Sequence, residues 1–168
     1  MVEASQRKPA ESRSILSTLE EVRAASLQCA GTATRMLTMY TQDLESEVYD
    51  QPKFIEAVKR LVLARGYAKV RVLLVEPSRA VYESSRFIAL ARRITSHIEI
   101  RHANPEFRRE PSAFLVADDR AVVYRLDASR WDGVSEMNDP AVARLYLDRF
   151  DEVWQASAPD VETRQLHL

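Results

Sequence analysis

The apolar residues of this chain follow two spacings, one typical of helices and the other typical of strands. Apolar residues three or four positions apart predict helices over residues 15–27, 54–62, 87–94 and 142–154. Continuous or alternating apolar runs predict strands over residues 35–40, 69–75, 97–101, 114–117 and 121–124. The last two strands flank Asp118-Asp119-Arg120, which predicts a tight hairpin.

Local signals predict where two of these helices begin and end. Ser17, three residues before Glu20, is predicted to cap the first helix. Asp50 is predicted to cap the second helix, with Pro52 in its first turn. Gly66 is predicted to end that helix, because glycine has the backbone freedom that a helix C-terminus often needs.

The predicted order of elements is helix-strand-helix-strand-helix-strand-strand-strand-helix. Strands separated by helices predict a parallel part of the sheet, and the late hairpin predicts antiparallel strands. The sequence therefore predicts an α/β fold with a single mixed β-sheet and helices on both faces. We expect one domain over residues 13–157, a disordered tail over residues 1–12 and a second tail over residues 158–168.

Composition agrees with one globular domain and excludes several classes of function. Of the 168 residues, 46% are apolar, and the formal net charge of −1 gives no overall attraction to nucleic acid or to an anionic membrane. Cys29 is the single cysteine, which excludes an internal disulfide framework and a cysteine-based zinc site. No apolar run approaches the roughly 18 residues of a membrane span, and the polar first residues are not a secretory signal. We therefore expect a cytoplasmic protein without membrane contact.

Few residues are arranged for catalysis or for metal binding. The three histidines lack the spacing of metal ligands, and the three glycines lie too far apart for a phosphate-binding loop or a Gly-x-Ser-x-Gly motif. We expect no metal and no cofactor. Ligands of open α/β sheets usually bind beyond the carboxyl ends of parallel strands, which here are residues 41–43, 76–78 and 101–102.

The middle of the chain is locally basic, at Arg92-Arg93, Arg101, Arg108-Arg109 and Arg120. One interpretation is a surface that recognises phosphate groups. The other is a solvated face whose charge is balanced by neighbouring glutamates. The interspersed acids favour the second interpretation, because nucleic-acid surfaces usually carry an excess of positive charge.

One stretch resembles a known family. Residues 111–125, followed by residues 138–154, resemble the end of a phospholipase D-like half-domain. In that family a strand begins His-x-Lys and ends in Asp, and a returning strand, an Asn and a closing helix with Phe and Trp follow. Here Pro111 and Ala113 stand at the His and Lys positions, while Asp118 matches the Asp.

The resemblance implies the fold of a phospholipase D-like half-domain without its chemistry. The family's His forms a phosphohistidine, its Lys binds phosphate and its Asp supports the His. A chain without the covalent nucleophile has lost the mechanism, so we expect no enzyme of this type. Active members place two half-domains face to face, which implies a two-fold homodimer here.

We therefore expect a non-catalytic module that binds a partner protein or a small anionic ligand in an accessory or regulatory role. The candidate ligand-binding residues are Arg101, His102, Ser112, Asp118, Arg125 and Asn138. Two alternatives remain. One is a nucleic-acid binding module, which the balanced charge disfavours. The other is a hydrolase of unrelated mechanism, with Asp118 or Asp43 as general base.

Overall fold

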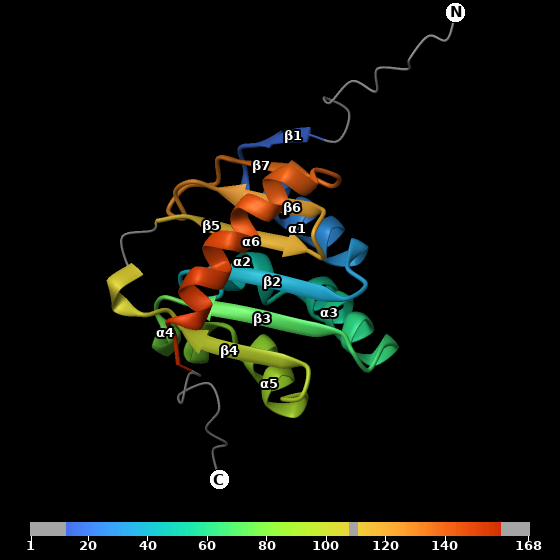
Figure 1. Ribbon diagram of the computed structural model, residues 1–168, viewed down its shortest axis with the longest axis vertical. Coiled ribbons are helices and arrows are strands. Elements are labelled where there is room, and N and C mark those ends of the chain that lie inside the picture. The colour runs from blue at the N-terminus through green and yellow to red at the C-terminus, as the bar shows by residue number, and fades with distance from the viewer. Residues whose placement is uncertain (1–12, 108–110, 159–168) are drawn as a thin grey trace, which may run out of the picture.

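A mixed sheet forms the centre of the computed structural model, which describes residues 13–107 and 111–158 (Figure 1). The sheet has seven strands in the order β1-β7-β6-β5-β2-β3-β4. The strands are β1 (Arg13–Leu16), β2 (Met36–Thr41), β3 (Lys69–Leu74), β4 (Ile98–His102), β5 (Ala113–Ala117), β6 (Ala121–Arg125) and β7 (Gly133–Glu136). The expected tail over residues 1–12 and, apart from Ala158, the one over residues 158–168 lie outside the described residues.

The sheet is parallel on one side and antiparallel on the other. Strands β2, β3 and β4 pair in parallel, as the intervening helices predict. β5 pairs antiparallel with β2, and β6, β7 and β1 continue the antiparallel part. The carboxyl ends of β2, β3, β4 and β6 and the amino ends of β5 and β7 therefore lie at one edge of the sheet. We call it the carboxyl edge.

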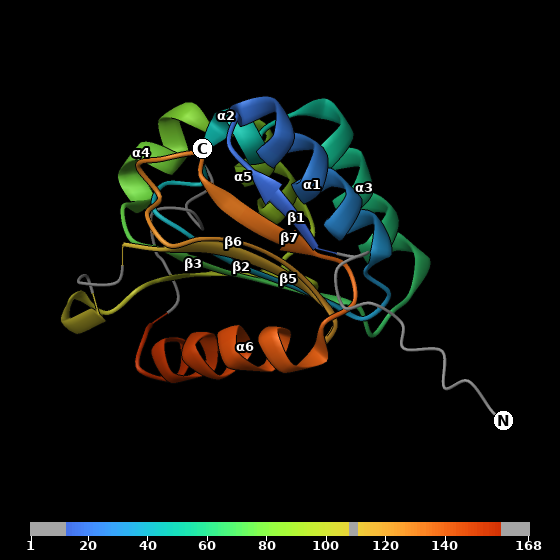
Figure 2. The ribbon, with the colours of Figure 1, turned by 90° about the horizontal axis from the view of Figure 1, so that it is seen from above.

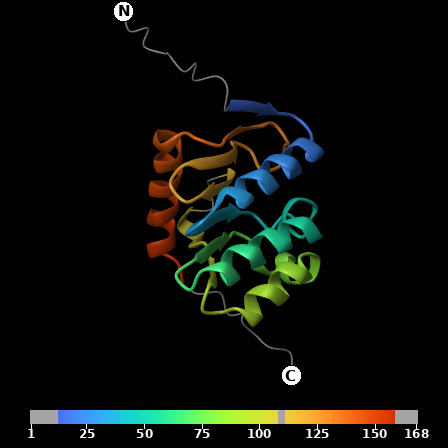
Figure 3. The same ribbon diagram turned by 90° about the vertical axis from the view of Figure 1, so that its right-hand side faces the viewer.

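Helices cover both faces of the sheet unequally (Figures 2 and 3). The helices are α1 (Leu19–Thr32), α2 (Ser46–Tyr49), α3 (Pro52–Ala64), α4 (Pro77–Glu83), α5 (Ser85–Arg93) and α6 (Pro140–Gln155), with a 3₁₀ turn η1 (Pro105–Phe107). Helix α6 lies alone across one face, and α1 to α5 lie on the other. Because neighbouring residues of a strand point to opposite faces, Met39 and Tyr40 of β2 belong to two different apolar clusters. The predicted α/β fold, with one mixed sheet and helices on both faces, is confirmed.

The predicted start of the first helix was wrong. Ile15 and Leu16 belong to strand β1, which pairs antiparallel with β7. Two apolar neighbours just before a helix fit either periodicity, and the pairing with β7 decides for a strand. The helix cap is Thr18, one residue later than predicted, and its Oγ1 accepts a hydrogen bond from the Glu21 backbone N–H at 3.2 Å.

The second predicted helix also has different ends. Its N-cap is Gln51, with Pro52 in the first turn as predicted. The Asp50 carboxylate instead accepts a hydrogen bond from the Phe87 backbone N–H at 2.9 Å, which ties α5 to the loop before α3. The helix ends at Ala64, its C-cap Arg65 is extended with a φ of −147°, and Gly66 does not provide the predicted left-handed end.

Candidate functional site

Three segments from distant parts of the sequence meet at the carboxyl edge around an open hollow of about 580 Å³. They are residues 42–47 after β2, residues 127–131 after β6, and Pro111 before β5. Arg79 and Glu83 of α4 complete the lining. The hollow has the size of small-molecule sites, and it lies where the sheet topology predicts a ligand.

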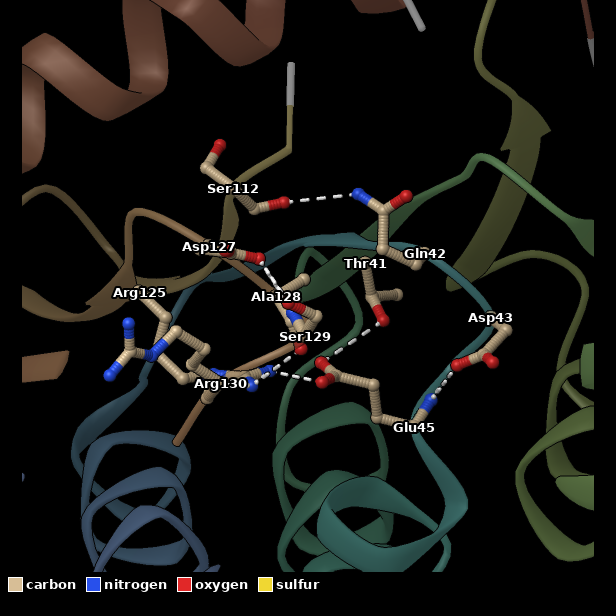
Figure 4. Close-up of polar contacts among 10 residues, drawn as sticks. All are labelled: Thr41, Gln42, Asp43, Glu45, Ser112, Arg125, Asp127, Ala128, Ser129 and Arg130. Atoms are coloured by element: carbon tan, nitrogen blue, oxygen red, sulfur yellow. Dashed lines mark hydrogen bonds and ion pairs between the residues drawn. The ribbon is translucent and has the colours of Figure 1, made fainter. Parts of the chain in front are cut away.

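Glu45, which lines the hollow, forms a buried ion pair with Arg125 (Figure 4). The side chains are only 10% and 3% exposed. Arg125 Nη1 also donates to the carbonyls of Ala128 and Arg130 at 3.0 and 2.8 Å. Its guanidinium lies 5.0 Å from the centre of the Trp131 ring. The Arg125 guanidinium is therefore held from several sides by groups of its own chain.

Burial raises the pKa of Glu45 above its ordinary value. The charge and the hydrogen bond of Arg125 act in the opposite direction and offset part of this rise. The pair shows the usual balance of a buried ion pair, in which desolvation opposes attraction.

The backbone that presents Glu45 is in an unusual conformation. Leu44 and Glu45 have φ angles of 65° and 31°, in the left-handed region that non-glycine residues rarely adopt. Leu44 is fully buried in the apolar cluster between the sheet and helices α1 to α5. Asp43 Oδ1 accepts a hydrogen bond from the Glu45 backbone N–H at 3.0 Å. Burial of Leu44 and pairing of Glu45 hold the loop in a conformation that costs about 1–3 kcal/mol per residue.

The positions that match the family's His and Lys lie beside this ion pair. Pro111 lines the hollow, and Ala113 is buried in β5 directly opposite Arg125 of β6. Between them, Ser112 is buried, and its carbonyl accepts a hydrogen bond from Gln42 Nε2 at 3.2 Å. Of the six candidate residues, Ser112 and Arg125 are therefore brought together at the carboxyl edge.

Asp118 and Asn138 lie at the opposite edge of the sheet. Asp118 follows the carboxyl end of β5 and has a φ of 55°. Its carboxylate accepts hydrogen bonds from the backbone N–H groups of Thr34, Arg35 and Met36. Burial acts to raise the pKa of Asp118, but these bonds outweigh it and lower the pKa below its ordinary value. Exposed Asn138 precedes Asp139, whose backbone N–H donates to the carbonyl of Arg120.

This placement also separates the two carboxylates considered for a general base. Asp43 lines the hollow, whereas Asp118 lies beyond the other end of the strands. They cannot act together in one cleft.

Arg101 and His102 end β4 but do not line the hollow. Arg101 Nη1 donates to the Trp154 carbonyl at 2.8 Å, and the guanidinium lies 4.1 Å from a Trp154 ring centre. Arg101 therefore holds the end of α6 to the sheet. His102 Nε2 is buried and has no hydrogen-bond partner among the described residues. Over the same part of the chain, no three His, Cys, Asp or Glu side chains are placed to hold a metal ion.

The sequence did not single out Glu45, Arg79 and Trp131, which line or approach the hollow. They come from three separate elements, and Glu45 lies 80 residues from its partner Arg125. No spacing rule connects such residues. The sequence marked this edge through residues 41–43, 76–78 and 101–102, and of these Gln42 and Asp43 line the hollow.

Comparison with protein families matches residues 18–166 to a family described as a domain of unknown function, DUF7931. A search of curated proteins found no match. In the described part of the chain, no helix has the length and apolar character needed to cross a bilayer.

Solved structures that share the fold include the following three. TrmBL2 is described as an archaeal chromatin protein with a novel mode of DNA binding; its TM-score is 0.66 at 16% identity, over 95% of this chain and 57% of TrmBL2. Nuc from Salmonella typhimurium, a phospholipase D family member, has a TM-score of 0.60 at 16% identity, over 88% of this chain and 98% of Nuc. The phosphatidylserine synthase of Haemophilus influenzae Rd KW20 has a TM-score of 0.60 at 12% identity, over 84% of this chain and 36% of the synthase.

These comparisons establish a phospholipase D-like α/β fold, because identities this low show the fold alone. The match spans nearly all of Nuc but only 57% of TrmBL2. The expected resemblance to a phospholipase D-like half-domain is confirmed at the level of the fold.

Proposed function

The chain belongs to the DUF7931 family, and we propose that it is a phospholipase D-like module without phosphodiesterase activity. In this proposal the module binds a ligand or a partner protein through the hollow at the carboxyl edge of its sheet.

The Glu45–Arg125 pair is the observation that carries this proposal. The family's route needs a nucleophile and a phosphate-binding cation at this edge, where Pro111 and Ala113 stand instead. Arg125 is the nearest replacement for the missing cation, but its guanidinium already donates to Glu45 and to two backbone carbonyls. A hollow of ligand size remains, and Arg125 pairs with the Glu45 carboxylate in its lining.

Two measurements test the proposal. The first is hydrolysis of bis(p-nitrophenyl) phosphate, which we expect to stay at the level of the buffer blank. The second is a thermal-shift screen with metabolites of positive, negative and zero charge. We expect a subset of related compounds to raise the melting temperature, because a ligand that binds only the folded state stabilises it.

A matched pair of variants assigns any stabilisation to the hollow. Ser129→Trp fills the hollow from its lining, whereas Ser96→Trp adds the same bulk at an exposed position after α5. The stabilisation should vanish in Ser129→Trp and persist in Ser96→Trp. Ester hydrolysis above the blank, or stabilisation that survives Ser129→Trp unchanged, contradicts the proposal.

A second candidate, nucleic-acid binding, rests on the opposite edge of the sheet. There the exposed residues Arg35, Lys69 and Arg120 stand at the starts of β2, β3 and β6, and Arg65 is exposed in the preceding loop. Helices α1 and α3 end at this edge. Cations near a helix C-terminus interact favourably with the helix dipole, so these residues also have a structural explanation.

Anisotropy of a labelled DNA duplex at 50 and 200 mM salt tests this candidate, since phosphate contacts weaken steeply with salt. Arg65→Ala should lower the affinity if this edge binds DNA, while Arg144→Ala on α6 serves as control. Absence of binding at the lower salt concentration eliminates the candidate.

A further inference from the structure

The hollow carries more negative charge than its own cations balance. Among the residues that the structure describes, its lining holds five acidic residues and a single basic residue, Arg79. Arg125 neutralises Glu45. Within the described lining, Arg79 is then the one basic residue beside the remaining acids, which are Asp43, Glu47, Glu83 and Asp127.

Among the described residues, the basic side chains near the hollow offset this excess only in part, since the charges of Arg130 and Arg125 act on Asp127. Arg130 pairs with Asp132 at 3.0 Å, outside the lining. Arg23 donates through Nε to the backbone carbonyl of Glu47 and leaves its carboxylate charge in place. An anionic ligand would meet repulsion here, whereas a cation would meet a complementary potential.

Residues of the lining already hold two guanidinium groups of the chain itself, one in the lining (Arg79) and one outside it (Arg125). Arg125 is held tightly by a carboxylate, two carbonyls and the face of Trp131. This is the usual environment of a recognised guanidinium, with planar donors met by oxygens and an aromatic ring.

Arg79 is held only loosely. Its Nη1 lies 3.7 Å from Asp43 Oδ2, its Nη2 lies 3.9 Å from Glu83 Oε1, and its side chain is 60% exposed. Both distances are too long for hydrogen bonds, and exposed pairs of this kind contribute about 0–1 kcal/mol. An external cation with better geometry can therefore displace Arg79 from these carboxylates at little cost.

We propose that the hollow recognises a guanidinium or ammonium group, which takes the place of Arg79 between Asp43 and Glu83. Trp131, half-buried in the lining, supplies an apolar wall for the carbon chain that bears this group. The inference rests on the proposed binding function and replaces the small anion expected from the sequence with a cation. The cation is either a free small molecule or an Arg or Lys side chain of a partner protein.

Tryptophan emission provides a direct test, because the chain has two tryptophans and only Trp131 lines the hollow. Trp154 lies on the other face of the sheet, stacked on Phe150 of α6. In a Trp154→Phe variant, emission therefore reports on the hollow. Calorimetric titration of the wild-type chain gives the same affinities if that variant fails to fold.

The probes are L-argininamide, an acetylated and amidated peptide of four arginines, and inorganic phosphate at matched ionic strength. We expect saturable binding of at least one cationic probe with a Kd of about 1 mM or lower, which corresponds to about −4 kcal/mol. Phosphate should produce no saturable change. Binding of argininamide as tightly as the peptide points to a small molecule, and binding of the peptide alone points to a basic segment of a partner.

Two variants give opposite expectations. Glu83→Gln removes one carboxylate and should weaken cation binding about three- to tenfold, whereas Arg79→Ala removes the internal competitor and should strengthen it by a similar factor. Glu152→Gln on α6, outside the hollow, is the control and should change nothing.

Saturable binding of phosphate that weakens in Arg79→Ala overturns the inference but leaves a binding hollow. If neither argininamide nor the arginine peptide binds saturably, the inference is overturned as well. In that case a neutral or anionic compound whose thermal stabilisation is lost in Ser129→Trp still supports the proposed function, so the two failures are distinguishable.

Discussion

Asp118 has a structural role, because its charged carboxylate binds backbone N–H groups. Its carboxylate accepts hydrogen bonds from the N–H groups of Thr34, Arg35 and Met36, just before β2. Asp118→Asn keeps a residue that tolerates the left-handed conformation but removes the charge. We expect it to lower the free energy of unfolding by about 1–2 kcal/mol at pH 7, measured by urea denaturation.

The pH dependence of this loss has a fixed sign. Because the pKa of Asp118 is lowered in the folded state, its stabilisation is present above the unfolded pKa and disappears as pH falls through the folded pKa. The difference between wild type and Asp118→Asn should therefore shrink in acid. Asp119→Asn, exposed in the same turn, is the control, and an equal loss in that variant would contradict a specific role for Asp118.

Glu136 shows the opposite behaviour. It is 7% exposed, its Oε2 has no hydrogen-bond partner among the described residues, and its Oε1 lies 3.9 Å from Arg13 Nε. Burial raises its pKa, and the neighbouring Asp139 carboxylate raises it further. A carboxyl whose folded pKa is raised gives stability that is present below the unfolded pKa and lost as pH rises through the folded pKa.

Replacing Glu136 by Gln removes a charge that the folded state disfavours. We expect Glu136→Gln to be more stable than wild type at pH 8, with the gain vanishing below about pH 4, where an ordinary Glu is protonated. Thermal unfolding followed across this pH range gives the comparison, with exposed Glu56→Gln as control. A stability loss in Glu136→Gln at pH 8 would show that its contact with Arg13 outweighs its burial.

At the scale of elements, α6 depends on two arginines of the sheet. Arg71 of β3 pairs with Asp151 at 2.7 Å, and Arg101 of β4 donates to the Trp154 carbonyl and lies over the Trp154 ring. Arg101→Ala should lower the free energy of unfolding by about 1–3 kcal/mol through loss of the hydrogen bond and the ring contact.

The effect should be local as well as global. Hydrogen exchange should become faster near the C-terminal end of α6 in Arg101→Ala, since this end loses its attachment to β4. Arg144→Ala removes an exposed arginine of the same helix and should change stability by less than about 0.5 kcal/mol. Equal effects of the two substitutions would contradict an anchoring role for Arg101.

The sequence predicted the elements with long apolar patterns and missed most of the short ones. Helix α6 presents a stripe that runs from Ala143 to Trp154, and β3 alternates polar and apolar residues before an apolar end, so both were found. Strands β1 and β7 have four residues each, too few to show an alternation. Helix α4 was not predicted, because Pro77, which begins it, is equally typical of the end of a strand.

The candidate site was predictable only in outline. The order of strands and helices indicates which edge of the sheet carries a ligand, and residues 41–43 lie there. The Glu45–Arg125 pair depends on a left-handed loop and on the antiparallel return of β6. Both are set by tertiary packing rather than by local periodicity, so a charged residue within the chain gives no sign that it will be buried and paired.

At the scale of the whole molecule, one sheet is shared by two apolar clusters. Within β2, Leu37 and Met39 pack toward α1 to α5, while Tyr40 packs toward Phe114 and α6. Because the same strands support both clusters, we expect them to unfold together. Far-ultraviolet circular dichroism and tryptophan emission should give the same urea midpoint. Separate midpoints would show that α6 and its cluster detach first.

The two-fold homodimer implied by the family resemblance remains a prediction. The charges at the carboxyl edge predict how its stability depends on salt. A two-fold axis at the carboxyl edge would set one acidic hollow opposite the other, and like charges in apposition oppose association. Salt screens this repulsion, so dimerisation through this face should strengthen between 50 and 500 mM NaCl. Light scattering should then show a mass approaching twice 19.2 kDa at the higher salt concentration. A monomer mass at both concentrations would exclude the dimer, and a dimer that weakens with salt would place the interface elsewhere.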